Sequence, residues 1–320
     1  MQKLEHTPVM LNEVIEFLEP KKGGCFIDCT LGAGGYSLAL SKIVGNSGFI
    51  LGIDPDKNAI DYVVNIIKEK KIKNIKLAND NYKEIDKIFE ENREDCQASL
   101  CDGIVFDLGL SQDQLKDGTR GFSFLVDAPL NMAFGPSVTN ENTTWRLINR
   151  RKETELVKIF FEYGEERFAR RIAKGIIEAR KLNAINTTQE LVNIIKKSVP
   201  QGYINGKGIH YATRTFQALR IATNDELENI KIVLPKAINL LKKGGRIAVV
   251  SFHSLEDRII KQYFKLENKD CVCPKEVPIC GCQQKQKLKI INKKVIKPSE
   301  LELARNPKAR SAKLRVAEKI

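Results

Sequence analysis

Long hydrophobic runs are missing from this sequence of 320 residues, and none approaches the roughly 18–20 residues of a membrane-spanning helix. The first residues also show no apolar core of a signal peptide. We therefore expect no membrane partner and a cytoplasmic location, with the eight cysteines reduced or bound to metal. Hydrophobic residues make up 42% and charged residues 29%, which excludes disorder over most of the chain.

Two common catalytic signatures are also missing. The absence of Gly-x-Ser-x-Gly excludes the nucleophile elbow of the α/β-hydrolases. The absence of Gly-x-x-x-x-Gly-Lys-[Ser/Thr] excludes the phosphate loop of the P-loop NTPases. Only three histidines are present, so candidates for a histidine base are few.

Positive charge is in excess and is clustered. The 53 lysines and arginines outnumber the 40 acidic residues, which gives a formal net charge of +13. Residues 146–181 hold eleven basic and six acidic residues, and residues 283–320 hold twelve and three. Clusters of this kind are typical of a polyanionic partner, most often a nucleic acid. A lysine-rich solubilising surface is the alternative interpretation.

The first third of the chain alternates short apolar runs with amphipathic segments. This pattern predicts βαβ units and a parallel sheet. The expected strands are residues 24–28, 49–53, 75–78 and 103–106, and the expected helices are 36–44, 57–70 and 82–91.

The alternation stops after Asp107, and the following hundred residues contain only helical patterns, at 154–180 and 189–198. Strand signals resume at 246–252, preceded by a helix over 226–241 that Pro235 should kink or split. Asn224 is the expected N-cap of that helix. After a helix over 255–266, a terminal antiparallel hairpin is expected from residues 288–295 and 312–316. We therefore predict a first domain of residues 1–111 and 212–320, interrupted by an inserted helical domain of residues 112–211.

A glycine-rich turn follows the first expected strand. Gly32-x-Gly34-Gly35 opens a helix, which lets the backbone approach a ligand closely. Ser37 replaces the third glycine of the dinucleotide fingerprint, so a pyrophosphate is not required. Asp54 ends the second expected strand, where an acid accepts hydrogen bonds from ribose hydroxyls. The two features favour a nucleoside-containing ligand, and a tight turn with a capping aspartate is the alternative.

Two later strand ends carry candidate catalytic residues. Asp107 ends the fourth strand and is followed by Leu-Gly-Leu-Ser111. Ser251 and His253 follow the most apolar strand. Ligand crevices of open α/β sheets lie at such carboxyl ends. Asp107 is therefore a candidate catalytic group, or else a turn cap, and His253 is either a general base or a packed polar residue.

Four cysteines lie close together in the last quarter of the chain, as Cys271-x-Cys273 and Cys280-x-Cys282. Clustered cysteines in a reducing compartment indicate a structural zinc site. The spacing differs from the usual C-x₂-C, and a reduced, metal-free loop is the alternative.

Arginines alternate with aromatic residues in two segments. These are Arg167-Phe-Ala-Arg170-Arg171 and Arg214-Thr-Phe-Gln-Ala-Leu-Arg220. Guanidinium groups bind phosphates and stack on bases, so we expect these arginines to bind RNA. Phe168 and Phe216 should mostly pack in the core.

Eight segments taken together match the motifs of one family. They are His6–Met10, Asp28–Gly35, Asp107–Ser111, Arg120–Phe124, Tyr163–Arg167, Ala212–Gln217, Gly245–Arg258 and Asn306–Ser311. From about His6 to Glu318, the chain resembles the bacterial small-subunit rRNA cytosine-N4 methyltransferases of the RsmH (MraW) type.

The resemblance implies a class I S-adenosylmethionine-dependent methyltransferase. Its α/β fold would have a Rossmann-like, mostly parallel sheet and an inserted all-helical substrate-recognition domain. The family methylates the exocyclic N4 of a cytosine in the decoding region of 16S rRNA. S-adenosylmethionine is thus the implied cofactor, and small-subunit rRNA or the 30S subunit is the implied partner.

Motif matching also implies individual roles. The implied cofactor contacts are Gly34, Gly35, Tyr36, Asp54, Tyr82, Asp107 and Gln114. Asp54 would hold the ribose hydroxyls and Tyr82 would lie beside the adenine. We expect Asp107 to orient the target amine or the cofactor, with His253 or Ser251 assisting. The target base must leave its stack to reach the pocket.

The chain departs from the family pattern in one segment. The family usually has Leu-Asp-Met-Arg-Met there, and this chain has Leu130-Asn-Met-Ala-Phe134. The missing acid and arginine leave two other interpretations open. One is a non-enzymatic rRNA-binding or ribosome assembly factor, and the other is a methyltransferase with another acceptor, such as DNA or protein. The sequence also leaves open whether the protein forms a homodimer.

Overall fold

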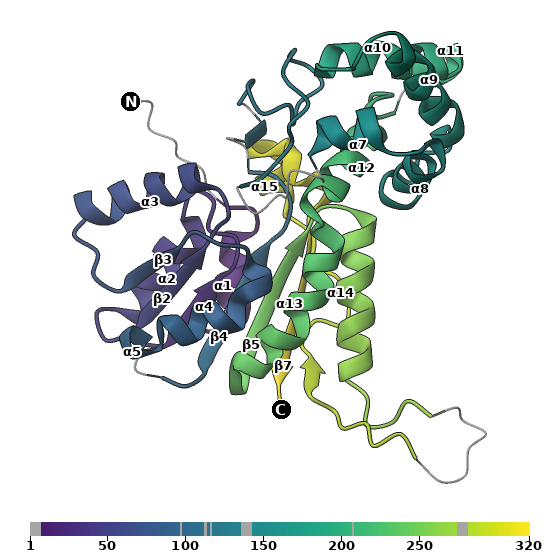
Figure 1. Cartoon of the computed structure of the whole chain (residues 1–320). Coiled ribbons are helices and arrows are strands. Elements are labelled where there is room, and N and C mark those ends of the chain that lie inside the picture. The colour runs from purple at the N-terminus through teal and green to yellow at the C-terminus, as the bar shows by residue number, and fades with distance from the viewer. Residues whose placement is uncertain are drawn as a thin grey trace. The chain divides into compact units, whose positions relative to one another are not determined.

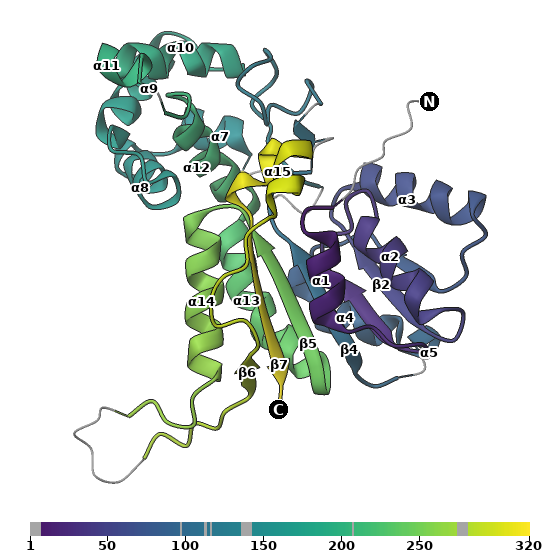
Figure 2. The same ribbon diagram turned by 180° about the vertical axis from the view of Figure 1, so that it is seen from behind.

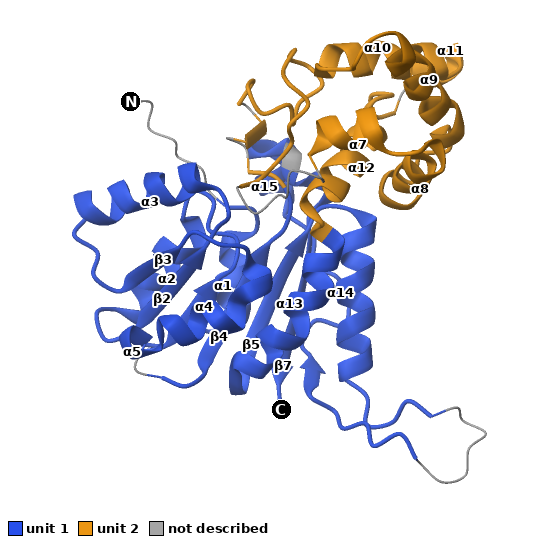
Figure 3. Ribbon diagram, viewed as in Figure 1, with its two compact units in different colours: residues 1–109, 227–320 blue, residues 110–226 orange. Residues whose placement is uncertain are grey.

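The computed structural model describes residues 8–96, 98–111, 114–115, 117–135, 143–206, 208–273 and 281–320. The chain divides into two compact units, coloured separately in Figure 3. The first consists of Met1–Gly109 and Leu227–Ile320, and the second is the intervening segment Leu110–Glu226.

The first unit contains a seven-stranded sheet in the order β3-β2-β1-β4-β5-β7-β6. Its strands are β1 (Cys25–Asp28), β2 (Phe49–Ile53), β3 (Ile75–Ala78), β4 (Cys101–Asp107), β5 (Leu241–Ser251), β6 (Leu288–Ile290) and β7 (Lys313–Lys319). Strands β1 to β5 pair in parallel, and β7 pairs antiparallel with both β5 and β6. The predicted Rossmann-like, mostly parallel sheet is confirmed, and so is the terminal antiparallel hairpin.

Alternating side chains bury both faces of this sheet. Ile27 and Phe106 belong to the core on one face, whereas Phe26 and Val105 belong to the core on the other. This alternation follows from the two-residue period of a strand. Helices cover both faces, as Figures 1 and 2 show from opposite sides.

The helices of the two faces are distinguished by the core to which they contribute. One face is covered by α4 (Ile85–Glu91), α5 (Arg93–Cys96), α13 (Glu226–Leu240) and α14 (Ser254–Glu267). The other is covered by α1 (Leu11–Leu18) and α2 (Gly35–Val44), and α3 (Lys57–Glu69) adds a small cluster of its own. The described residues of the unit also form three short helices, namely η1 (Tyr82–Glu84), α15 (Glu300–Arg305) and η2 (Pro307–Ser311).

The structure corrects three expectations about this unit. Helix α13 continues through Pro235 without a break, because buried apolar residues on both sides of the proline pack against the sheet. Strand β5 begins at Leu241 and not at Arg246. Helix α1 was not expected from the sequence.

The second unit is helical, as predicted. Its helices are α7 (Thr144–Arg150), α8 (Glu153–Gly164), α9 (Ala169–Leu182), α10 (Thr188–Ser198), α11 (Gln201–Ile204) and α12 (Thr213–Asn224). Helix α12 packs on α7 and α8, so the unit extends to Glu226 and not only to the expected Tyr211. Gln112, the other expected boundary, lies outside the described residues. Substrate recognition by this unit stays a prediction.

The single helix expected over residues 154–180 is divided into α8 and α9. Glu165 caps α8 in the left-handed region, with φ of 48°. A side chain at Gly164 would place its Cβ 2.5 Å from the Arg214 carbonyl oxygen. Glu166 is fully buried and accepts hydrogen bonds from Phe168 N and the Tyr203 hydroxyl, each at 2.8 Å. The Tyr163–Arg167 motif thus has a structural role within this unit.

Among the helices that the structure describes, none combines the length and the apolar character needed to cross a bilayer.

Candidate functional site

Four polar side chains stand at or just after the carboxyl ends of neighbouring parallel strands. Asp28 ends β1, Asp54 follows β2, Asp107 ends β4 and Ser251 ends β5. Crevices at these ends are the usual ligand sites of open α/β sheets. Asp54, Asp107 and Ser251 were expected at this site from the sequence, and Asp28 was not.

Asp28 is fully buried beneath the glycine-rich turn. Its Oδ2 accepts hydrogen bonds from the Ser37 hydroxyl at 2.7 Å and from Ser37 N at 3.2 Å. Burial raises the pKa of Asp28 to about 6, although these hydrogen bonds oppose the shift. This contact explains why a serine replaces the third glycine of the fingerprint. An acid at the end of the first strand was the available signal in the sequence.

The glycine-rich turn requires glycine at two positions. Gly34 has φ of 79°, in the left-handed region that L side chains rarely adopt. A Cβ at Gly35 would lie 2.1 Å from Pro8 Cγ. Tyr36 follows them, but its ring is buried in the core and its hydroxyl donates to the Val9 carbonyl. A cofactor contact at Tyr36 would therefore have to come from its backbone.

Asp54 is held rigidly by backbone donors. Its Oδ2 accepts a hydrogen bond from Gly32 N and its Oδ1 accepts one from Asp56 N, both at 2.8 Å. Burial raises the pKa of Asp54 to about 6. Each carboxylate oxygen has two lone pairs, so each has acceptor capacity left for a ribose hydroxyl.

The remaining expected cofactor residues differ in their surroundings. Tyr82 is half-buried and meets Phe106 edge-to-face, with ring centroids 5.7 Å apart. Gln114 belongs to the second unit, where its Oε1 accepts from Ser111 N at 3.1 Å. Contact of either residue with the cofactor stays a prediction.

Two oxygens at the carboxyl ends of β4 and β5 are buried without a partner. Within the described residues, neither Asp107 Oδ1 nor Ser251 Oγ has a hydrogen-bond partner. Burial raises the pKa of Asp107 well above its usual value, and the nearby carboxylates of Asp28 and Glu256 raise it further. Because buried unsatisfied polar atoms are rare and costly, these two oxygens mark the strongest candidate for chemistry in this unit.

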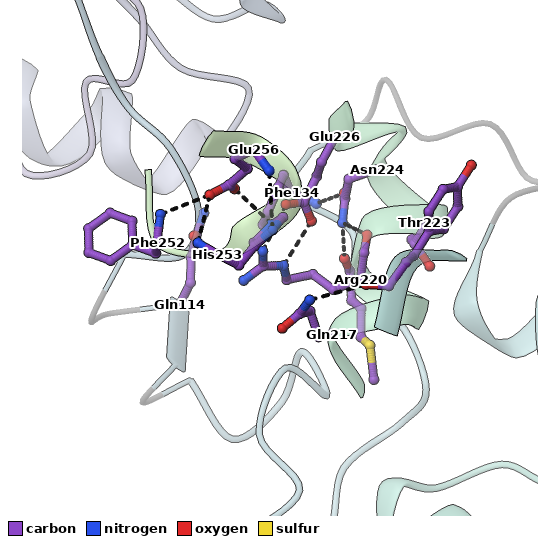
Figure 4. Close-up of polar contacts among 12 residues, drawn as sticks. Gln114, Phe134, Gln217, Arg220, Thr223, Asn224, Glu226, Phe252, His253 and Glu256 are labelled. Carbon is purple, nitrogen blue, oxygen red and sulfur yellow. Dashed lines mark hydrogen bonds and ion pairs between the residues drawn. The ribbon is translucent and has the colours of Figure 1, made fainter. Parts of the chain in front are cut away.

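His253 acts as the N-cap of α14. Its Nδ1 accepts a hydrogen bond from Glu256 N at 3.4 Å, and its Nε2 lies 3.0 Å from Glu256 Oε1. Glu256 Oε2 in turn accepts from Phe252 N and His253 N, as Figure 4 shows. Both ring nitrogens of His253 therefore lie close to Glu256, but Nε2 makes no hydrogen bond within the described residues, and a role of His253 as a base stays a prediction.

Most of the arginines expected to bind RNA lie at the start of α9. The guanidinium of Arg167 lies 4.8 Å from the ring centroids of both Phe168 and Tyr203, and Arg171 lies over Phe168 at 5.8 Å. Arg170 is exposed. Stacked, exposed guanidinium groups of this kind suit phosphates and unpaired bases.

The other two arginines bind partners within their own unit. Arg214 donates to the Glu165 carbonyl. Arg220 is mostly buried and makes a two-pronged ion pair with Glu226, at 2.8 and 2.9 Å (Figure 4). Two of the guanidinium nitrogens of Arg220 thus bind Glu226, and RNA contact by Arg220 stays a prediction.

The Leu130–Phe134 segment is ordered despite its departure from the family pattern. Arg120 donates to the carbonyls of Ala133 and Phe134, at 2.7 and 2.9 Å. Asn224 accepts from Phe134 N and donates to the Met132 carbonyl, each at 2.8 Å. Asn224 is the last residue of α12 and holds this segment, so the expected N-cap role is wrong.

Of the four clustered cysteines, Cys271, Cys273 and Cys282 lie together in the segment that joins α14 to β6. Cys280 lies outside the described residues. His6, which belongs to the His6–Met10 motif, also lies outside the described residues.

Comparison with known proteins identifies the family. Residues 3–320 match the model of the MraW methylase family. The chain belongs to the MraW methylase family. Three bacterial relatives share its length and are each called ribosomal RNA small subunit methyltransferase H. They come from Halothermothrix orenii (45% identical, covering 99% of both chains), Caldicellulosiruptor bescii (44%, 99% of both) and Clostridioides difficile (43%, 99% of this chain and 100% of the relative).

S-adenosylmethionine is the methyl donor of this family. The residues of this chain fit such a group. The turn at Gly34 and Gly35 leaves no room for side chains, and Asp54 offers fixed acceptors at the end of the neighbouring strand. When bound, the cofactor supplies an electrophilic methyl group.

Proposed function

We propose that this protein transfers the methyl group of S-adenosylmethionine to the exocyclic N4 amine of a cytosine in the decoding region of 16S rRNA. The name of its relatives supports a small-subunit rRNA acceptor. The single observation that carries the proposal is the pair of buried oxygens without partners, Asp107 Oδ1 and Ser251 Oγ, in a methylase-family chain.

The acceptor nitrogen needs help because its lone pair is delocalised into the cytosine ring. A hydrogen-bond acceptor on the amino group makes the nitrogen a better nucleophile, and Asp107 Oδ1 offers that acceptor. The new bond joins the methyl carbon to N4 as the carbon–sulfur bond breaks, leaving a neutral thioether. The positively charged amine then loses a proton. The raised pKa of Asp107 makes its carboxylate a stronger proton acceptor than an ordinary aspartate.

Ser251 and His253 have secondary roles in this proposal. The Ser251 hydroxyl donates or accepts a second hydrogen bond at the same strand ends. His253 positions the start of α14 through Glu256, and it would act as a base only if its ring left that carboxylate.

RNA binding in this proposal comes from the arginines at the start of α9 and just before it. Arg167, Arg170 and Arg171 bind the phosphates around the target, and Arg214 extends the same basic surface of the second unit. The target cytosine must leave its stack, at a cost of a few kcal/mol.

The reaction takes place in the cytoplasm, on small-subunit rRNA or the assembled 30S subunit. A homodimer stays a prediction.

The test is methyl transfer from labelled S-adenosylmethionine by the full-length protein. The acceptors are 30S subunits and naked 16S rRNA from cells that lack this modification. We expect label in one of these two RNAs and none in DNA or protein. Tight cofactor binding without transfer to any acceptor would favour an assembly factor, and label in DNA or protein would favour another acceptor.

The Asp107→Ala variant distinguishes the two roles proposed for this carboxylate. If Asp107 orients the target amine, kcat falls while the KM for S-adenosylmethionine stays close to that of the unmodified protein. If Asp107 instead holds the cofactor, that KM rises.

A further inference from the structure

Three sulfurs converge in the segment between α14 and β6. The Sγ atoms of Cys271, Cys273 and Cys282 all lie within 4.8 Å of one another. The Cys271 and Cys282 sulfurs are 3.8 Å apart, far beyond the roughly 2.05 Å of a disulfide bond. A tetrahedral ion with zinc–sulfur bonds of about 2.3 Å separates two sulfurs by about 3.8 Å. The spacing therefore matches ligands of a shared metal ion.

Backbone donors point at two of these sulfurs. Val272 N lies 3.5 Å from the Cys282 sulfur, and Cys273 N lies 3.4 Å from the Cys271 sulfur. Such N–H groups stabilise the negative charge of a thiolate, and thiolate is the form that binds a metal. Outer hydrogen bonds of this kind are a regular part of metal sites.

The two described parts of the segment also meet at its base. Its base is closed by a hydrogen bond from Lys287 N to the Glu267 carbonyl at 2.8 Å and by an ion pair between the two side chains. Its described residues between α14 and β6 form no helix or strand, and the Val272 side chain is exposed. Figure 1 shows the described residues on both sides of this segment extending away from the sheet. A bound metal would tie the two described parts of the segment together.

The remaining described cysteines are of a different kind. Cys25, Cys29, Cys96 and Cys101 are buried in the core on one face of the sheet. Burial raises the pKa of the Cys29 and Cys101 thiols, which disfavours the thiolate. These cysteines provide an internal control for any metal-binding measurement.

We propose that Cys271, Cys273 and Cys282 are thiolate ligands of a structural zinc ion. Soft thiolate ligands select zinc over magnesium, calcium and manganese. The site follows the C-terminal end of α14, whereas His253 caps the other end, about 20 Å away along a helix of 14 residues. The ion therefore orders the segment and takes no part in methyl transfer.

Zinc binding is tested on the full-length protein after treatment with a chelator. Titration with Zn²⁺ in competition with a coloured chelator should show that each chain binds about one zinc ion tightly. Replacement by Co²⁺ should give an intense sulfur-to-cobalt charge-transfer band and the strong visible bands of a tetrahedral site. These spectra need no variant, so they test the site even if a variant fails to fold.

The variant to compare is Cys271→Ser with Cys282→Ser. It should weaken zinc binding at least about 100-fold and abolish the cobalt charge-transfer band, because it removes two ligands. Val272→Ala, in the same segment, keeps all the sulfurs and should bind like the unmodified protein. S-adenosylmethionine affinity should be unchanged in both. Absence of tight zinc in the unmodified protein, equal zinc binding in the double variant, or a Cys271–Cys282 disulfide in place of bound metal would overturn the proposal.

Discussion

Charged side chains stand both at the carboxyl ends of the strands and at the start of α9, but the two groups differ in burial and in their partners. At the strand ends the carboxylates are buried, and Asp107 Oδ1 has no partner among the described residues. At the start of α9 the guanidinium groups of Arg167 and Arg171 lie over aromatic rings, and both residues are exposed. A buried atom without a partner costs stability and is kept for a specific contact, whereas an exposed arginine costs little.

This difference separates two kinds of effect. Changes at the strand ends should alter the reaction or the cofactor affinity, with little dependence on salt. Changes on α9 should alter RNA affinity, with strong dependence on salt, because phosphate contacts release counterions.

The largest effect is expected for Asp107→Ala. It removes the proposed acceptor of the target amine, so kcat/KM for methyl transfer should fall by at least about 100-fold. Thermal unfolding should show no loss of stability, because a costly buried oxygen is removed. Asp61→Ala, an exposed acid on α3, is the matched control and should retain full activity. Near-normal transfer by the Asp107 variant would show that the unpaired oxygen is not used.

The next effect is expected for Asp54→Asn. The amide nitrogen of the new side chain would face the backbone N–H of Gly32 or of Asp56. One charged hydrogen bond is then lost, and two hydrogen-bond donors point at each other. The Kd for S-adenosylmethionine, measured by titration calorimetry, should rise roughly 10- to 100-fold. The transfer rate at saturating cofactor should change far less. An unaltered Kd would remove Asp54 from the cofactor site.

Cofactor affinity should also depend on pH. Asp54 has a pKa of about 6, and hydroxyl donors favour its ionised form. The affinity should therefore be constant above that pH and fall as the pH drops through 6, by about tenfold for each further unit. Titrations from pH 5 to 8 test this, and an affinity that rises on acidification would contradict it.

The smallest effect is expected for Arg167→Ala combined with Arg171→Ala. RNA affinity at moderate salt should fall roughly three- to tenfold, and the salt dependence should become shallower by about one to two counterions. S-adenosylmethionine affinity should not change. Lys174→Ala is the matched control on the same helix, where Lys174 pairs with Glu178. An unchanged salt slope would break the assignment of RNA binding to α9.

The sequence predicted the parts of this structure that depend on local periodicity. Strands ending in Asp28, Asp54 and Asp107 could be located because apolar runs with acidic ends are visible along the chain. The parallel arrangement then brings these ends to one edge of the sheet.

Features set by tertiary contacts could not be predicted. The role of Asp28 depends on Ser37, nine residues later, and becomes visible only when the turn is formed. The ion pair of Arg220 with Glu226 depends on the left-handed turn at Asp225, which the sequence does not reveal. Pro235 does not break α13, because sheet packing outweighs the lost hydrogen bond.

The central claim concerns one atom of the acceptor, and mass spectrometry of small-subunit rRNA tests it most directly. Unmethylated RNA or subunits are incubated with the protein and S-adenosylmethionine, and fragments and nucleosides are then mapped. The account predicts one added methyl group, on N4 of a cytosine in the decoding region. A methyl group on another atom or on another nucleoside would contradict this account. So would the absence of any added methyl group on RNA that the protein binds.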